Sequence, residues 1–261
     1  GIKNTKPPLL FWQGMLSTNH GAGWSLFNLR WPSLVYTALT TLLIVLSAVA
    51  ISKNLSAGVL AGVIWLAFFN TYRYGRPYLA EPPEIFWLCL PFFLLLIVGK
   101  RLIESKLVFP LITGSAFGFA LLYKSVAYIV PACLVLTLWY WQWRDRRVME
   151  CIQRDLFKVI SIGLIALGLF ALWFVFDPDP MAIWNEFVIG ENAGKFAARN
   201  TSYLKDFVWG GDSVGMLLVT GVANAGFLAF VVFNLFYLAI RDHKSMSTEE
   251  KLLWIWIAVF F

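Results

Sequence analysis

The feature that most constrains this chain is the recurrence of apolar runs close to a membrane span in length. A helix needs about 20 mainly apolar residues to cross a hydrocarbon core about 30 Å thick. Charged residues make up 14% of the chain, whereas a soluble domain usually carries about 25%. We therefore predict an all-α polytopic membrane protein, a bundle of about seven complete transmembrane helices and one truncated helix, with interfacial helices in its extracytoplasmic loops.

Seven stretches have the length and hydropathy of spans, and their expected limits follow from the polar residues around them. The first begins near Pro32, because proline is tolerated in the first turn of a helix. The segment before it, residues 8–29, is interrupted by glycine and polar residues and is expected to form an interfacial helix and a turn. The spans are expected over 32–51, 57–71, 85–99, two stretches between 107 and 143 that meet at Lys124, 159–176 and 214–240.

Two glycines in the second span, Gly58 and Gly62, form a GxxxG pattern. Small residues at this spacing let two helix backbones approach closely in a membrane. This pattern predicts a helix–helix contact.

The distribution of basic residues predicts the orientation of the bundle. The segments 100–106 and 144–158 are the two most basic in the chain, and the positive-inside rule places both in the cytoplasm. An even number of spans must then separate them, which places Lys124 at an extracytoplasmic turn. By the same count, segments 1–31, 72–84, 124–125 and 177–212 all lie on the extracytoplasmic side.

These four segments carry ionisable residues on the extracytoplasmic side, where the positive-inside rule predicts few lysines and arginines. Such residues at a membrane edge are functional candidates, since they are costly there. Lysine and arginine at head-group depth suit a phosphate group. The cations are Lys6, Arg73, Arg76, Lys124 and Lys195, and the acids are Glu81, Glu84 and Glu191.

A structural interpretation stands beside each functional one. Lys6, held by the rigid Pro7–Pro8 step, could be a membrane anchor whose charge reaches the interface. Lys124 could form an ion pair with Glu81 or Glu84. Glu81 could be a carboxylate at a helix N-terminus, where the helix dipole favours negative charge.

The long segment 177–212 is too aromatic for a linker, and loops of this length in compact proteins are usually functional or disordered. Its first part has an amphipathic pattern, with one apolar helical face formed by Met181, Trp184, Phe187 and Val188. Such a helix would rest on the membrane plane. We predict an ordered extracytoplasmic lid over 177–212 that carries Glu191, Asn192 and Lys195.

Several classes of site and partner are not expected. The net charge of +6 is interpreted as membrane-related, since no basic run with interleaved aromatic residues lies outside the apparent spans; nucleic acid is not an expected partner. Cys89, Cys133 and Cys151 show no CxxC pairing, and two of them lie in apolar runs, so neither a disulfide nor a metal role is expected for them. His20 and His243 fall on opposite sides, so no zinc site of clustered histidines is predicted. We expect neither a metal nor a cofactor.

Five short motifs follow one another along the chain: Lys6-Pro7-Pro8-Leu9, Arg30-Trp31-Pro32-Ser33, Arg76 through Glu81-Pro82, Leu122-Tyr123-Lys124-Ser125, and Glu191-Asn192 followed by Lys195-Phe196. In these motifs and their order the chain resembles the membrane glycosyltransferases of the C-type superfold, in particular the bacterial aminoarabinose transferase and protein mannosyltransferase-like enzymes that use polyprenyl-phosphate sugars. In this family Asp is common at the position of Glu81, the segment around Lys124 reads Leu-Thr-Lys-Gly, and Arg stands at the position of Lys195.

The resemblance implies a single glycosyltransferase domain over residues 1–261 in the plasma (inner) membrane. The enzyme would move a sugar from a polyprenyl-phosphate donor to a lipid, glycan or protein acceptor at the extracytoplasmic face, with inversion at the anomeric carbon. Glu81 would be a catalytic carboxylate, Glu191, Asn192 and Lys195 would close over the substrate, and the donor phosphate would be bound by Lys6, Lys124, Arg76 and Arg73.

The resemblance also implies a principal catalytic Asp upstream of Lys6. The chain is therefore expected to be an internal fragment without that Asp, the first helix and the C-terminal part of the enzyme. Two other classes remain open. A transporter or flippase of lipid-linked sugars would also place cations at head-group depth, but it should show broken helices and midplane charges. A non-catalytic membrane subunit would keep the fold and lose the motifs.

Overall fold

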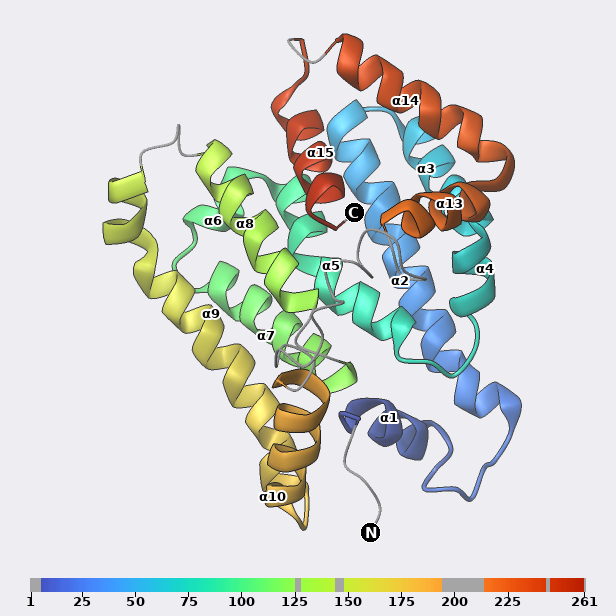
Figure 1. Cartoon of the computed structure of the whole chain (residues 1–261), viewed down its shortest axis with the longest axis vertical. Coiled ribbons are helices and arrows are strands. Elements are labelled where there is room, and N and C mark those ends of the chain that lie inside the picture. Colours follow the sequence, from blue (N-terminus) through green and yellow to red (C-terminus); the bar gives the residue numbers. More distant parts are fainter. Residues whose placement is uncertain (1–5, 125–127, 144–147, 194–213, 243–244, 261) are drawn as a thin grey trace.

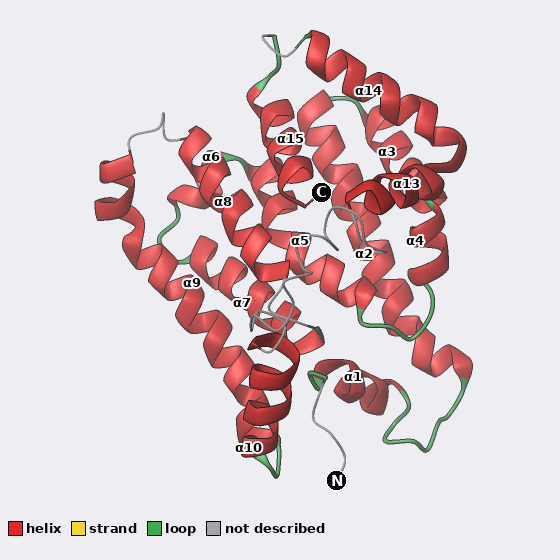
Figure 2. Ribbon diagram, viewed as in Figure 1, coloured by secondary structure: helices red, strands yellow, loops and turns green. Residues whose placement is uncertain are grey.

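A computed structural model of the chain describes residues 6–124, 128–143, 148–193, 214–242 and 245–260. Within these ranges every regular element is a helix (Figures 1 and 2), which confirms the predicted all-α class. The helices are α1 (Leu9–Ser17), α2 (Leu26–Ser52), α3 (Leu55–Ala67), α4 (Phe69–Tyr74), α5 (Glu81–Val98), α6 (Lys100–Glu104), α7 (Val108–Tyr123), α8 (Ile129–Trp143), α9 (Val148–Phe176), α10 (Pro180–Ala182), a π-helix (Ile183–Ala193), α13 (Val214–Ala225), a 3-10 turn (Gly226–Leu228), α14 (Ala229–Arg241) and α15 (Thr248–Phe260).

Seven apolar helical segments of the described chain match the predicted spans. Four are long and apolar enough to cross a membrane: Leu26–Ser52, Glu81–Val98, Arg154–Phe176 and Leu218–Arg241. The other three, α3, α7 and α8, are shorter apolar helices of 13, 16 and 15 residues. The chain is therefore an integral membrane protein.

The spanning helices α2, α3, α5, α7, α8 and α9 run in alternating directions between two ends of the bundle (Figure 1). The C-terminal ends of α2, α8 and α14 lie at one end, and α1 lies at the other end with the C-terminal ends of α7 and α9. This alternation agrees with the predicted order of loops. We refer to the end of the bundle at which α1 lies as the α1 end.

The first spanning helix begins earlier than the sequence pattern predicts. Ser25 accepts a hydrogen bond from the backbone N–H of Asn28 at 3.0 Å and caps the N-terminus of α2. Pro32, which was expected in the first turn, lies inside the helix and is buried. The serine cap therefore sets the start of this helix, rather than the proline.

Helix α9 also begins early, so most of the predicted basic loop 144–158 is helical. Lys158 is buried, with its Nζ atom 2.8 Å from Oδ1 of Asp155. The same ammonium donates to the carbonyl oxygen of Ile103 in α6, and Tyr140 of α8 donates to Asp155. Lys158 and Asp155 together therefore join α9 to α6 and α8, and Lys158 is not a loop charge.

The predicted span over 214–240 is present as two helices. Gly226 has φ +54, a left-handed backbone conformation that glycine adopts readily. It opens the 3-10 turn that separates α13 from α14. The glycine accounts for this interruption.

Close backbone contacts hold two pairs of helices together. A Cβ atom built on Gly58 would lie 2.3 Å from Cγ2 of Val49 in α2, so the predicted GxxxG contact is confirmed. Gly114 and Gly118 make a second contact of this kind, between α7 and α9. A Cβ atom on Gly118 would lie 2.7 Å from Cβ of Leu169.

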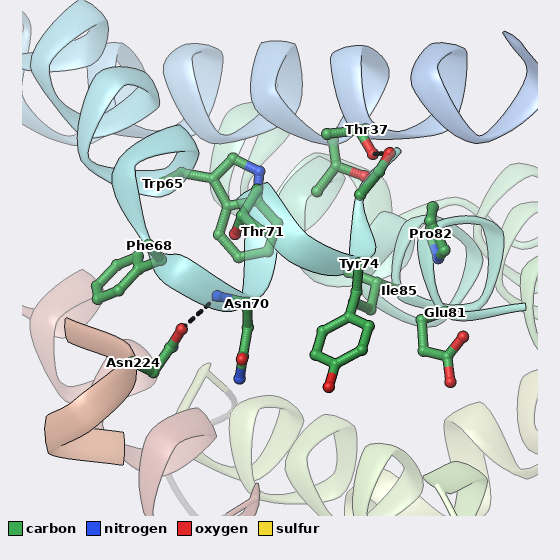
Figure 3. A pocket seen from close by; sticks show the side chains of 12 residues that line it. Thr37, Trp65, Phe68, Asn70, Thr71, Tyr74, Glu81, Pro82, Ile85 and Asn224 are labelled. Carbon is green, nitrogen blue, oxygen red and sulfur yellow. Dashed lines mark hydrogen bonds between the residues drawn. The ribbon is translucent and has the colours of Figure 1, made fainter. Parts of the chain in front are cut away.

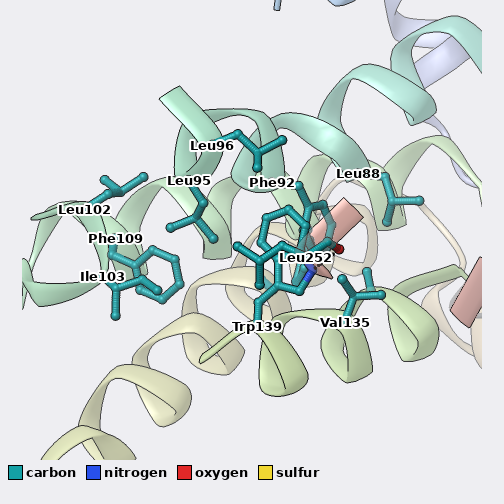
Figure 4. Close-up of a cluster of buried hydrophobic side chains, with 13 residues drawn as sticks. Leu88, Phe92, Leu95, Leu96, Leu102, Ile103, Phe109, Val135, Trp139 and Leu252 are labelled. Atoms are coloured by element: carbon teal, nitrogen blue, oxygen red, sulfur yellow. Dashed lines mark hydrogen bonds between the residues drawn. The ribbon is translucent and has the colours of Figure 1, made fainter. Parts of the chain in front are cut away.

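The largest apolar core lies between α5, α7, α8 and α15 (Figure 4). Trp139 is fully buried at its centre and packs edge-on against Phe92, with 5.4 Å between the ring centroids. Its indole Nε1 donates to the carbonyl oxygen of Leu252 at 2.7 Å. This bond attaches α15 to the rest of the bundle.

Candidate functional site

Three charged side chains meet where α5 begins and α7 ends. Nζ of Lys124, the residue that follows α7, lies 3.4 Å from Oε1 of Glu81 and 3.4 Å from Oε2 of Glu84. The two glutamates are three residues apart in the first turn of α5, so they share a face of the helix. We call Glu81, Glu84 and Lys124 the acid–lysine cluster.

The members of the cluster differ in their access to solvent. The side chains of Lys124 and Glu81 are 36% and 39% exposed, whereas that of Glu84 is 7% exposed. Burial alone would lower the pKa of the Lys124 ammonium, but the carboxylates of Glu84 and Glu81 raise it above its ordinary value. The ammonium is thus charged at neutral pH, and an accessible and a buried carboxylate flank it.

This geometry bears on two alternatives that the sequence left open. Lys124 does form an ion pair, and it does so with both glutamates. Glu81 does lie in the first turn of a helix, where the helix dipole favours a carboxylate. An ammonium has three N–H donors, so the two carboxylates that pair with it among the described residues leave one donor for a ligand oxygen.

Helix α1 packs across the cluster's end of the bundle. Tyr78 donates to the carbonyl oxygen of Leu10 at 2.6 Å, and Tyr123 donates to Oε1 of Gln13 at 2.7 Å. Gly14 permits this approach, since a Cβ atom there would lie 2.4 Å from the Tyr78 hydroxyl. Lys6 is exposed and precedes α1.

The N-terminal end of α1 and the segment after α9 meet at one apolar cluster. Leu122, two residues before Lys124, is buried with Trp173 of α9 and Phe187 of the π-helix, and Leu9 packs against them. The structure therefore brings described parts of all four predicted extracytoplasmic segments together at the α1 end.

The first part of the predicted lid is helical. Ile183 and Phe187 are buried against the bundle, whereas Met181 and Trp184 are 64% and 49% exposed. Exposed apolar side chains of this kind are compatible with a helix that rests on the membrane plane.

A cavity of about 370 Å³ opens beside Glu81 between α2, α3, α4, α5 and α13 (Figure 3). Hydroxyls, amides and aromatic rings line it together with the Glu81 carboxylate: Thr37, Thr40, Trp65, Asn70, Thr71, Tyr74 and Asn224 are among the lining residues. Among the described residues, Oγ1 of Thr40 and Nε1 of Trp65 are buried and have no hydrogen-bond partner.

Two of the predicted phosphate ligands lie elsewhere. Arg73 and Arg76 line a separate cavity of about 450 Å³ with Arg30. The guanidinium of Arg76 stacks on Tyr72, 3.9 Å from the ring centroid, and its Nε donates to the carbonyl oxygen of that tyrosine. The structure thus groups Glu81 with Lys124, and it groups Arg73 and Arg76 with Arg30.

The remaining predicted lid residues can be placed only in part. The backbone of Glu191 and Asn192 belongs to the π-helix, and Lys195 lies outside the described residues. No group of three or more histidine, cysteine, aspartate or glutamate side chains in the described ranges is arranged to hold a metal ion.

Two residues of interest were not selected as site residues from the sequence. Glu84 was considered only as an ion-pair partner, although its spacing from Glu81 places both carboxylates on one helix face. Arg30 belongs to the Arg30-Trp31-Pro32-Ser33 motif, for which the sequence predicts no separate role. No short motif joins it to Arg73 and Arg76, because the fold places the three residues around one cavity.

Comparisons with known proteins give a family and a relative. The family model described as dolichyl-phosphate-mannose-protein mannosyltransferase matches residues 4–185. An undecaprenyl phosphate-alpha-4-amino-4-deoxy-L-arabinose arabinosyl transferase from Aeromonas salmonicida (strain A449) is 25% identical over 244 residues, which cover 85% of this chain and 43% of that protein. The chain therefore spans less than half the length of that relative. No solved structure matches the chain significantly.

Proposed function

Since the chain belongs to the dolichyl-phosphate-mannose-protein mannosyltransferase family, we propose that it is the membrane domain of a glycosyltransferase that uses a polyprenyl-phosphate sugar. One observation carries the proposal: the acid–lysine cluster borders, through Glu81, a cavity lined by hydroxyls, amides and aromatic rings. A mainly apolar cavity with a few polar side chains and one carboxylate is the usual form of a small-molecule site. The name of the relative, whose substrate is an undecaprenyl-phosphate sugar, supports the donor class.

The proposed reaction needs a base and positive charge. The acceptor's nucleophilic atom bonds to the anomeric carbon while the bond from that carbon to the phosphate oxygen breaks. The bonding electrons leave with the polyprenyl phosphate, and the acceptor's proton passes to a carboxylate. Attack on the face opposite the phosphate inverts the anomeric centre.

Glu81 is the described carboxylate best suited to receive or orient the acceptor's proton. It is partly exposed and lies on the cavity wall, whereas Glu84 is buried behind Lys124. Glu84 is therefore a positioning residue that holds the ammonium. The family resemblance implies a further catalytic Asp before Lys6.

Positive charge for the departing phosphate comes from Lys124 together with Lys6. Lys124 alone carries no surplus charge, because two carboxylates flank it. Lys6 precedes α1, whose first residue Leu9 packs in one apolar cluster with Leu122, so an exposed second ammonium lies at the same end. Preorganised charges of this kind are worth about 3 kcal/mol each in transition-state stabilisation.

We place the site on the extracytoplasmic side of the plasma membrane. The support is the positive-inside reading of segments 100–106 and 144–158, which puts the α1 end outside. The acceptor is a lipid, a glycan or a protein.

A radiolabelled transfer assay on the full-length protein in proteoliposomes tests the proposal. With a polyprenyl-phosphate sugar as donor, the wild-type protein should move label into a new product, and Glu81→Gln should lower the rate by about 10²-fold or more. Glu249→Gln, the same substitution at an exposed position in the first turn of α15, is the matched control. Label that crosses the bilayer without a new product would identify a transporter, and the absence of both would identify a non-catalytic subunit.

A further inference from the structure

The cavity lined by Arg30, Arg73 and Arg76 is a second charged site at the α1 end, apart from the acid–lysine cluster. Arg30 lies in the second turn of α2, whereas Arg73 and Arg76 lie at and just after the end of α4. The fold thus brings guanidinium groups from two distant segments to one cavity. None of its lining residues carries a carboxylate; the others are Leu26, Phe27, Leu34 and Pro77. We call it the arginine cavity.

Aromatic neighbours hold two of the guanidinium groups. Arg76 stacks at 3.9 Å from the Tyr72 ring centroid, and Arg73 lies 5.2 Å from that of Tyr74. Cation–π contacts of this kind orient the guanidinium without neutralising it. Among the described residues, none of the three arginines is paired with a carboxylate. The arginine cavity therefore keeps its positive charge.

The two sites at this end differ in charge. The acid–lysine cluster combines one ammonium with two carboxylates, so the proposed donor phosphate needs Lys6 as a second cation there. The arginine cavity offers up to three forked donors, and a guanidinium matches the oxygens of a phosphate in a bidentate way. The arginine cavity can therefore bind an anionic head group without a further cation.

Apolar surface adjoins these charges. Leu26 and Phe27 are 68% and 69% exposed, and they open the membrane-spanning helix α2. The site therefore lies where a transmembrane helix enters the bilayer, at the depth of lipid head groups. A soluble phosphate would make no use of the exposed leucine and phenylalanine, whereas a lipid would place its glycerol and first acyl carbons on them.

We infer that the arginine cavity binds the phosphate head group of an anionic membrane phospholipid, with the acyl chains along Leu26 and Phe27. This inference does not rest on the proposed glycosyl transfer. Its assay contains no sugar donor, so a failed transfer assay and a failed binding assay are separate results.

The test is binding of phosphatidic acid with a fluorescent acyl chain to the full-length protein in detergent micelles, followed by fluorescence anisotropy. The triple variant Arg30→Gln/Arg73→Gln/Arg76→Gln should weaken binding at least tenfold. The matched control is Lys53→Gln/Arg101→Gln/Arg241→Gln, which removes the same charge from exposed positions elsewhere and should change the Kd less than twofold. Arg30→Lys/Arg73→Lys/Arg76→Lys keeps the charge without the fork and should give intermediate binding.

Two further binding measurements identify which part of the lipid the cavity recognises. Diacylglycerol with the same fluorescent chain lacks only the phosphate and should bind at least tenfold more weakly than phosphatidic acid. Inorganic phosphate should fail to displace the lipid when the two are present in equal amounts. The inference is overturned if the two glutamine variants bind phosphatidic acid equally, if diacylglycerol binds as tightly, or if inorganic phosphate competes on equal terms.

Discussion

Nζ of Lys124 lies 3.4 Å from Oε2 of Glu84, so the end of α7 is joined to the start of α5 through a buried carboxylate. The contact fixes where two spanning segments meet. It also holds the ammonium beside Glu81, the carboxylate on the wall of the cavity between α2, α3, α4, α5 and α13 (Figure 3). Stability and proposed catalysis therefore depend on the same lysine.

Replacing Lys124 with Met should lower both the stability of the protein and its turnover in the transfer assay. The change leaves two carboxylates facing each other, one of them buried, and should cost roughly 1–3 kcal/mol of unfolding free energy and about 10²-fold in turnover. Thermal unfolding in detergent and the transfer assay measure the two effects. Arg241→Met, which removes an exposed partner of Asp242, is the control and should change unfolding free energy by less than about 0.5 kcal/mol. Normal turnover in Lys124→Met would remove this lysine from the mechanism.

Replacing Lys6 with Met should lower turnover without lowering stability. Lys6 is exposed, so its loss should leave the melting temperature unchanged. Turnover should still fall by about tenfold or more, because one of the two cations proposed for the departing phosphate is gone. The transfer assay and a melting curve measure both quantities on one preparation. Unchanged turnover would favour the alternative that Lys6 is only a membrane anchor.

The glycines of α7 and α9 should respond in opposite ways to alanine. At Gly118 an added methyl group meets Leu169, so Gly118→Ala should destabilise the protein by about 1–3 kcal/mol. At Gly168 of α9 nothing lies within 4 Å of the added atom, and alanine favours the helix by up to about 1 kcal/mol. Melting temperatures of the two variants should therefore move apart. Equal shifts would mean that α7 and α9 do not pack closely at Gly118.

Breaking the buried pair of Lys158 and Asp155 should lower the free energy of unfolding much more than replacing both residues with apolar ones. Lys158→Met removes the ammonium that lies beside the buried Asp155 carboxylate and should cost about 3–5 kcal/mol. The double variant Lys158→Met/Asp155→Leu removes both charges and should recover most of that loss. Unfolding in denaturant measures the difference. A double variant no more stable than the single one would indicate that the hydrogen bonds to Ile103 and Tyr140 matter more than the charges.

The sequence was sufficient for the class of fold and the approximate spans. In a bilayer every backbone polar group must be bonded within the protein, so an apolar run of span length has to be a helix. The turn at Lys124 followed for the same reason, since the run from 107 to 143 is too long for one crossing. The contact at Gly58 was also predictable, because small residues at this spacing mark close packing.

Helix ends were less predictable, because they depend on individual partners. Ser25 caps α2 seven residues before the Pro32 that the pattern favoured. Lys158 was taken for a loop charge, yet Asp155 of its own helix, with groups on α6 and α8, makes its burial tolerable. A hydropathy pattern counts charges and does not record which of them will be paired.

For the candidate site, the sequence by itself determined which ends of the helices carry charge and that Lys124 and Glu81 belong to the same end. Only the tertiary structure decided that both glutamates hold Lys124, and that Arg73 and Arg76 join Arg30 in another cavity. The reason is geometric. Length and hydropathy fix the depth of a residue in the bilayer, whereas the rotation and packing of whole helices fix which side chains at that depth come into contact.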